Sequence, residues 1–257
     1  MCKNTMKLVV LVLDSYTPNS IRNSAIQKQT WVQDFEDSCD VLFYKAGKEN
    51  KKLGQDLILD CSDTYSAMGV KTIKAFEWVN SNLDYDYIFR TNTSSYVDFR
   101  NLMKYLSKIS KEETHYSGYI GKFDGIDYVS GSGIILSKLA IKSILKSKNQ
   151  LDESVVEDVA IGKLLKLNKI LPKEGKRKDI ESHKDIRNIH TDEYHIRCRL
   201  DPFGYSRNLE KYLINYFYMT FNSKNLFLEI IFSNAMKIDK AFLKFKKFLK
   251  FKLFTKI

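Results

Sequence analysis

The stretch YIFRTNTSSYVD, residues Tyr87–Asp98, decides which fold the sequence predicts. Its first half predicts a short buried strand, because apolar and aromatic residues in a run of this length favour strands. The strand ends in four small, polar and uncharged residues, Asn92–Ser95. Many enzymes place acidic side chains for a metal ion at the end of such a strand. The stretch therefore raises the question of how a strand end without acids could serve catalysis.

Strand-like and helix-like patterns alternate on both sides of this stretch. Apolar runs predict strands at residues 7–14, 39–47, 56–61 and 85–91, and at 116–121 and 126–137 around a glycine-rich turn. The spacing of apolar residues predicts helices at 20–32, 62–82, 100–109 and 155–168. This alternation predicts an α/β domain with a mostly parallel sheet flanked by helices. Short connections would bring binding groups to the carboxyl ends of the strands.

The positive charge of the chain is concentrated at its C-terminus. The net charge is +11, and the segment Lys237–Ile257 contributes +7 of it, from eight lysines and one aspartate. After about residue 201 the sequence becomes helical and rich in aromatic residues, which suggests a domain at 1–200 and a helical extension at 201–257. The apolar stripe of the tail consists of Ile238, Phe242, Phe245, Leu249 and Leu253.

Because most tail lysines would lie opposite this stripe on a helix, we expect the tail to bind an anionic membrane surface. A helix packed on the domain is the alternative. Nucleic-acid binding is not expected, because no nucleic-acid motif accompanies the charge.

The N-terminal segment and the cysteines indicate the compartment. The apolar run Leu8–Leu13 is too short for a signal sequence or a membrane span. The four cysteines show neither a CxxC pair nor metal-binding spacing. We therefore expect a reduced, cytoplasmic protein, peripheral on the inner face of the cell membrane.

Five fragments occur in an order that is typical of one enzyme superfamily. They are RNSAIQKQTW (22–31), DTYSAMGVKT (63–72), YIFRTNTSSYVDFRNLMKYL (87–106), YVSGSGIILS (128–137) and EDVAIG (157–162). Together they resemble the fringe-like and β-1,3-galactosyltransferase superfamily of inverting glycosyltransferases, over roughly residues 7–170. The resemblance implies a GT-A-like fold that binds a sugar nucleotide at its strand ends.

The resemblance places the acidic D-D-D motif of this superfamily on Asn92-Thr93-Ser94. In relatives those acids hold Mn²⁺ or Mg²⁺, and uncharged amide and hydroxyl groups are poor ligands for such cations. We therefore expect that no metal is required. Mn²⁺ or Mg²⁺ stays open as an alternative, through Asp98 together with His195 or His190. The literal D-x-D at Asp84–Asp86 sits at the entry end of the strand, about five residues from its exit, so we predict a solvated turn there.

Basic side chains are the expected replacement for the metal. Arg197 and Arg199 alternate and would share one face of a strand, as a phosphate clamp requires. An exposed strand salt-bridged to Asp192 and Glu193 is the alternative. The resemblance and the residue chemistry together give the candidate donor-binding residues: Arg22, Asp63, Tyr65, Lys71, Arg90, Asn92, Ser94, Gly131, Ser132, Gly133, His195, Arg197 and Arg199.

The E-D-V fragment implies that Asp158 is the general base that deprotonates the acceptor hydroxyl. The alternative for Asp158, and the preferred role of Glu157, is to stabilise the N-terminus of a helix. The predicted function is an inverting transfer of a hexose or N-acetylhexosamine from a UDP-linked donor. The predicted acceptor is a surface glycan or a lipid-linked precursor of the lipopolysaccharide or capsule type. A degenerate relative that binds a glycan or nucleotide without turnover is the alternative.

Overall fold

The computed structural model describes residues 6–35, 38–182, 185–187, 189–190, 192–199 and 207–222. Its main sheet has the strand order β3-β4-β2-β1-β5-β8-β7-β9. These strands are β1 (Leu8–Leu13), β2 (Asp40–Gly47), β3 (Lys51–Leu53), β4 (Asp56–Asp60), β5 (Tyr87–Asn92), β7 (Tyr116–Phe123), β8 (Ile126–Ser137) and β9 (Lys173–Glu174).

The centre of the sheet is parallel, and strands elsewhere in it run the other way. Strands β4, β2, β1 and β5 are parallel neighbours, as the alternating sequence pattern predicts. Strand β8 pairs antiparallel with β5 and with β7, and β3 pairs antiparallel with β4. The sheet is therefore mixed, and its parallel half brings the ends of β1 and β5 to one edge.

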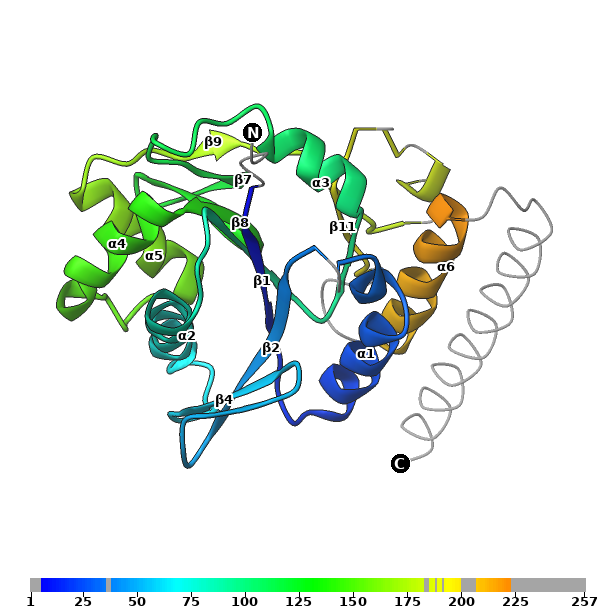
Figure 1. Cartoon of the computed structure of the whole chain (residues 1–257), viewed down its shortest axis with the longest axis horizontal. Coiled ribbons are helices and arrows are strands. Elements are labelled where there is room, and N and C mark those ends of the chain that lie inside the picture. Colours follow the sequence, from blue (N-terminus) through cyan, green and yellow to red (C-terminus); the bar gives the residue numbers. More distant parts are fainter. Residues whose placement is uncertain are drawn as a thin grey trace, which may run out of the picture.

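Helices cover both faces of this sheet (Figure 1). One face carries α2 (Met68–Asn82), α4 (Lys138–Lys146) and α5 (Glu157–Leu167). The other carries α1 (Pro18–Lys28), α3 (Phe99–Leu106) and α6 (Glu210–Asn222). Short 3₁₀ segments add η1 (Trp31–Phe35), η2 (Lys148–Gln150), η3 (Asp185–Arg187) and η4 (Arg207–Leu209).

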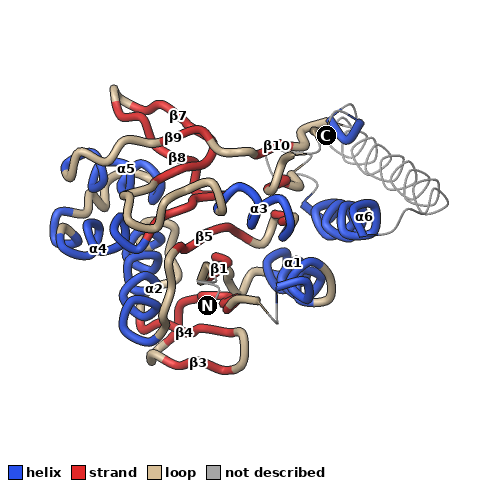
Figure 2. Tube along the Cα trace, turned by 45° about the horizontal axis from the view of Figure 1, so that its top comes forward, coloured by secondary structure: helices blue, strands red, loops and turns tan. Residues whose placement is uncertain are grey.

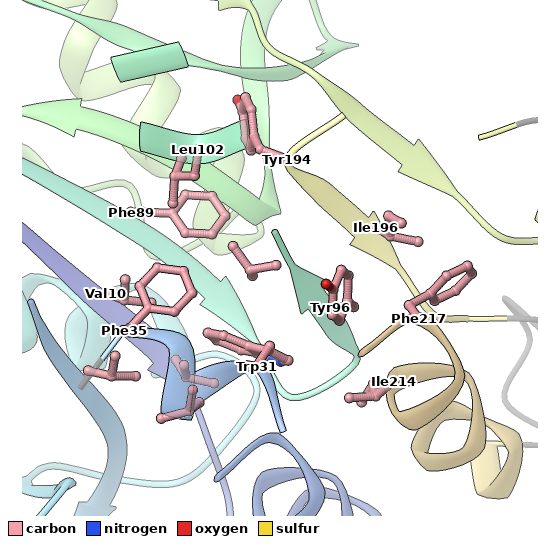
Figure 3. Packing of buried hydrophobic residues seen from close by; sticks show 14 of the residues in the cluster. Val10, Trp31, Phe35, Phe89, Tyr96, Leu102, Tyr194, Ile196, Ile214 and Phe217 are labelled. Atoms are coloured by element: carbon pink, nitrogen blue, oxygen red, sulfur yellow. The ribbon is translucent and has the colours of Figure 1, made fainter. Parts of the chain in front are cut away.

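The alternation of side chains along β1 divides the core into two clusters. Leu8, Val10 and Val12 pack with Trp31, Phe35 and the apolar residues of α3 and α6 (Figure 3). Val9 and Leu11 point to the opposite face and pack with apolar residues of α2, α4 and α5. Because both faces of the strand are buried, β1 is a continuous apolar run rather than an alternating one.

A second, three-stranded sheet flanks the carboxyl end of β5 (Figure 2). It has the order β10-β11-β6 and consists of β6 (Ser95–Val97), β10 (Arg177–Asp179) and β11 (His195–Arg197). Strand β11 pairs antiparallel with β6, so that Arg197 lies opposite Ser95. Since β6 follows β5 after only two residues, this pairing brings the late segment 195–199 to the exit end of β5.

Helix α1 corrects the predicted helix at residues 20–32. It ends at Lys28, Ile21 is 53% exposed, and the buried side chains are Ser20, Asn23, Ser24 and Gln27. The helix covers polar strand ends rather than an apolar surface, so it is held by hydrogen bonds. The amide of Gln27, for example, donates to the carbonyl oxygens of Asn92 at 3.1 Å and Ser95 at 2.7 Å.

The C-terminal part of the chain is described only as far as α6. This helix packs Leu213, Ile214 and Phe217 into the first core cluster. None of the helices described is both long and apolar enough to cross a membrane. The predicted amphipathic tail, Lys237–Ile257, lies outside the described residues, and the division of the chain at residue 201 stays a prediction.

Candidate active site

A polar cleft of about 510 Å³ lies at the carboxyl ends of β1 and β5. Its walls come from these strand ends, the loop before α2, the β8 segment 130–132, the start of α5, and the arginines of the 195–199 segment and η4. These segments are far apart in sequence and meet because the parallel strands end at the same edge. The cleft therefore lies where the sequence predicts a ligand site.

Asn92, Thr93 and Ser94 form a closed turn in this cleft. The amide oxygen of Asn92 accepts hydrogen bonds from the backbone N–H of Ser94 at 3.0 Å and from its hydroxyl at 2.8 Å. The hydroxyl of Thr93 lies 3.2 Å from that of Ser20 on α1. The turn is thus organised by its own polar groups.

The ligand set at this turn does not fit a hard divalent cation. The oxygen of Asn92 is already used inside the turn, and hydroxyls contribute no charge. Asp98 is buried and caps α3, accepting from the backbone N–H of Asn101 at 2.8 Å. Nowhere in the described ranges do three His, Cys, Asp or Glu side chains gather as a metal site would require. Asp98 therefore serves as a helix cap, and its alternative role as a metal ligand is not supported.

His195 is a core residue rather than a donor ligand or a metal ligand. Its side chain is fully buried, packs edge-on against Phe89, and lies 2.9 Å from the hydroxyl of Ser95 through Nε2. Burial lowers the pKa of His195 well below its ordinary value, and the charges of Arg177 and Arg197 act in the same direction. His195 is therefore neutral. His190, the other candidate, is exposed and does not line the cleft.

Gly133 makes room for this histidine and not for a sugar. A Cβ atom at Gly133 would lie 2.3 Å from Nδ1 of His195. Gly131 and Ser132, by contrast, do line the cleft. The predicted glycine-rich element is thus divided between packing and the site.

Three of the four carboxylates in the cleft already have a cation. Asp63 pairs with Lys71 at 2.7 Å, and Asp14 lies 3.3 Å from Lys45. Glu157 pairs with Arg90 at 2.6 Å. Lys71 and Arg90 line the cleft as predicted, but their charges are largely neutralised by these partners. They are therefore poor candidates for neutralising a leaving diphosphate.

Arg90 and Glu157 belong to a buried network beneath the cleft. Arg90 also donates to the hydroxyl of Tyr44 at 2.9 Å, and the hydroxyl of Thr72 donates to Glu157 at 2.7 Å. Burial raises the pKa of Glu157, while Arg90 and Thr72 oppose that shift. Burial also raises the pKa of Tyr44 to about 12. Glu157 does lie in the first turn of α5, but its main contact is this ion pair, which the sequence pattern did not indicate.

Asp158 is the cleft carboxylate without an ion pair among the described residues. It is partly exposed, and its Oδ2 accepts from the backbone N–H of Gly131 at 2.9 Å. Its Oδ1 accepts from the N–H of Val159 at the start of α5. These two hydrogen bonds orient the carboxylate at the N-terminus of a helix, and part of it remains open to the cleft.

Arg197 and Arg199 both line the cleft, as predicted, and Arg207 joins them from η4. The alternative of an exposed, salt-bridged strand is wrong: His195 and Ile196 are buried, Arg197 is 3.9 Å from Asp179, and Asp192 pairs with Lys176 instead. Arg207 lies outside the motifs quoted from the sequence, so the sequence did not indicate its place in the cleft.

Two other candidates lie at or beyond the rim. Arg22 is exposed on α1 beside Asn19 and does not line the cleft, so its predicted donor-binding role is not supported. Tyr65 lines the cleft and is 73% exposed, which leaves its ring available to a ligand.

The architecture matches a known fold. A glycosyltransferase involved in the glycosylation of the major capsid of PBCV-1 aligns with a TM-score of 0.50 and 10% identity, over 82% of this chain and 98% of that one. The fold, with its cleft at the strand ends, is therefore the GT-A fold of glycosyltransferases.

The sequence comparisons add similarity to one family of proteins. Residues 36–125 match the family model described as Galactosyltransferase. The chain is 27% identical over 193 residues to UDP-GalNAc:beta-1,3-N-acetylgalactosaminyltransferase 1 of Sus scrofa, covering 65% of this chain and 56% of that protein. The human protein is 25% identical over 214 residues, covering 67% and 65%.

The matched region thus spans between about half and two thirds of the length of these relatives. The resemblance predicted from the sequence is confirmed: part of the chain matches the Galactosyltransferase family model, and the chain is similar to β-1,3-N-acetylgalactosaminyltransferases.

Proposed function

We propose that the chain is an inverting glycosyltransferase that moves a hexose or N-acetylhexosamine from a UDP-linked donor to a glycan hydroxyl. The observation that carries this proposal is Asp158, a partly exposed carboxylate in the cleft that is oriented by Gly131 and free of an ion pair among the described residues. Such a carboxylate is available to accept a proton, as a general base must be.

In the proposed step, the acceptor hydroxyl gives its proton to Asp158 while its oxygen bonds to the anomeric carbon of the donor. The bond from that carbon to the diphosphate breaks, and its electron pair leaves with UDP. Attack opposite the leaving group inverts the configuration. The relatives are named for UDP-GalNAc, which makes this the first donor to test.

The acceptor is proposed to be a surface glycan or lipid-linked precursor at the inner face of the cell membrane. The support is the basic, aromatic composition of Lys237–Ile257, since lysines and apolar side chains together favour an anionic interface. Deletion of this segment should release the protein from anionic vesicles in a flotation assay. Equal flotation of the full-length and shortened chains would contradict this proposal.

A donor screen tests the central proposal. The full-length protein is incubated with UDP-Glc, UDP-Gal, UDP-GlcNAc and UDP-GalNAc, and released UDP is measured with and without a soluble glycan acceptor. We expect slow hydrolysis of one donor and faster release with acceptor. The loss of the acidic motif favours a second candidate, a non-catalytic binding protein. That candidate predicts donor binding without any release of UDP, a result that would overturn transfer.

A further inference from the structure

We propose that the cleft binds the diphosphate of its donor through an anion cradle formed by the side-chain amide nitrogen of Asn92 and the guanidinium groups of Arg197, Arg199 and Arg207. This inference rests on the proposed function for the identity of the ligand. Its chemistry concerns only a pyrophosphate group and can be tested without sugar transfer.

The orientation of the Asn92 amide is fixed by its neighbour. The backbone N–H of Ser94 can only donate, so the amide atom 3.0 Å from it must be the oxygen. The nitrogen of the amide is therefore at the other position, with two N–H donors. No group in the described part of the chain accepts a hydrogen bond from this nitrogen, and Asn92 lines the cleft. The position thus offers donors, which suit an anion, instead of the acceptor oxygens that a cation needs.

Backbone pairing joins the segment that carries Arg197 and Arg199 to this turn. Arg197 is the register partner of Ser95, and the backbone N–H of Cys198 donates to the carbonyl of Ser94 at 2.8 Å. Arg197 and Arg199 flank Cys198, and both line the same cleft as Asn92. The amide and the guanidinium groups therefore belong to one continuous wall.

Positive charge exceeds negative charge along this wall. The described residues place three arginines, Arg177, Arg197 and Arg207, around two carboxylates, Asp179 and Glu210. Arg177 donates two hydrogen bonds to the carboxylate of Asp179, at 2.5 and 2.6 Å. Arg197 lies 3.9 Å from the same carboxylate. Burial and the charge of Arg177 lower the pKa of Arg197. An anion beside Arg197 would relieve this repulsion.

Arg207 is held in place by a buried acid. Its guanidinium donates to Glu210 at 3.0 and 3.2 Å, and the same carboxylate accepts from the amide of Asn23 on α1 at 2.6 Å. Glu210 is 1% exposed, so its carboxylate is held inside the protein. This contact therefore fixes the orientation of Arg207, which lines the cleft. Because Glu210 neutralises much of its charge, Arg207 would contribute fixed N–H donors to phosphate oxygens, and Arg197 and Arg199 would contribute the net positive charge.

Calorimetric binding of inorganic pyrophosphate and of UDP in EDTA tests the cradle. We expect the wild-type protein to bind both ligands equally well in EDTA and in Mg²⁺. Arg197→Gln and Arg199→Gln should each weaken binding about tenfold or more, because charge-assisted hydrogen bonds are lost. The matched control is Arg100→Gln, an exposed arginine outside the cleft, which should bind as the wild type does.

Asn92→Asp provides the second, sharper variant, because it keeps the shape of the side chain and the acceptor for Ser94. It should weaken pyrophosphate binding in EDTA about tenfold or more, and Mn²⁺ should restore that binding. Thermal unfolding checks that each variant is folded. Wild-type binding that requires a divalent cation, or variants that all bind in EDTA like the wild type, would overturn the cradle.

The two proposals fail separately. Pyrophosphate binding that depends on the arginines, in a protein that turns over no UDP-sugar, would leave the cradle standing and remove the transferase. Sugar transfer that survives in variants with unchanged pyrophosphate binding would leave the transferase standing and remove the cradle.

Discussion

The entry end of β5 is acidic and exposed, whereas its exit end is uncharged and lies in the cleft. At the entry end, Asp84 pairs with Lys7 and with Lys138 at 3.3 Å, and Asp86 pairs with Lys111 at 2.7 Å. At the exit end, Asn92 closes a turn on Ser94. A D-x-D sequence therefore exists beside this strand, at the end away from the cleft. The direction of the strand, more than the presence of the motif, decides what the acids can do.

The largest difference between the two ends is expected in catalysis. Asp158→Asn should lower kcat by about 10²–10⁴, because a general base contributes on that order. Asp84→Asn is the matched control at the entry end and should leave kcat within about twofold, since that acid is a solvated surface group. Release of UDP and product formation measure both. A variant at Asp158 that retains more than about a tenth of the wild-type rate would remove it as the base.

The second difference concerns stability. Arg90→Met should lower the free energy of unfolding by about 3–5 kcal/mol, because it leaves the buried Glu157 without its cation. Lys7→Met removes an exposed ion pair at the entry end, where the side chains of Lys7 and Asp84 are 55% and 66% exposed, and should leave the free energy of unfolding nearly unchanged. Urea unfolding compares the two. Equal losses would show that the Arg90 pair is not the buried support described above.

The smallest effect is expected at a buried histidine near the entry end. His115 hydrogen-bonds through its backbone to Ser137, the register partner of Tyr87, and burial lowers the pKa of His115 to about 4. The unfolded chain, with a histidine pKa of about 6.5, then binds the proton more readily than the folded protein.

The stabilising contribution of neutral His115 is therefore present above about pH 6.5 and is lost as the pH falls toward 4. At pH 5.5 this loss amounts to about 1 kcal/mol. His115→Gln should flatten the decline of unfolding free energy between pH 7 and pH 5. An unchanged slope would contradict the assignment.

Strand positions were predictable because strands buried on both faces are continuous apolar runs in the sequence. The apolar runs at residues 7–14 and 85–91 became β1 and β5 with shifts of at most two residues at either end. Helix α4 was missed, although Ser137 caps it and Ala140, Ile141 and Ile144 show helical spacing. Helix α1 misled the prediction because its buried face is polar, and a rule based on apolar periodicity cannot find such a face.

The site was predictable in its location and less so in its contacts. Asp158, Asn92 and Arg197 line one cleft, as motif order and strand ends indicate. The pairing of Arg90 with Glu157, 67 positions apart, follows from three-dimensional packing that a single sequence does not record. The same is true of Arg207, whose place in the cleft depends on its contacts with Glu210 and, through it, Asn23.

The close approach of Gly133 to His195 has a consequence for how substitutions in this protein would combine. An alanine at 133 would push the imidazole, which lies two residues before Arg197 on β11, and so disturb a charge that Gly133 never touches. In a saturation screen for activity, Gly133 would score like a substrate contact. A smaller residue at 195 would make that alanine tolerable, so the two positions should show strong epistasis. Correlated substitutions at positions 133 and 195 would then reflect packing rather than substrate specificity.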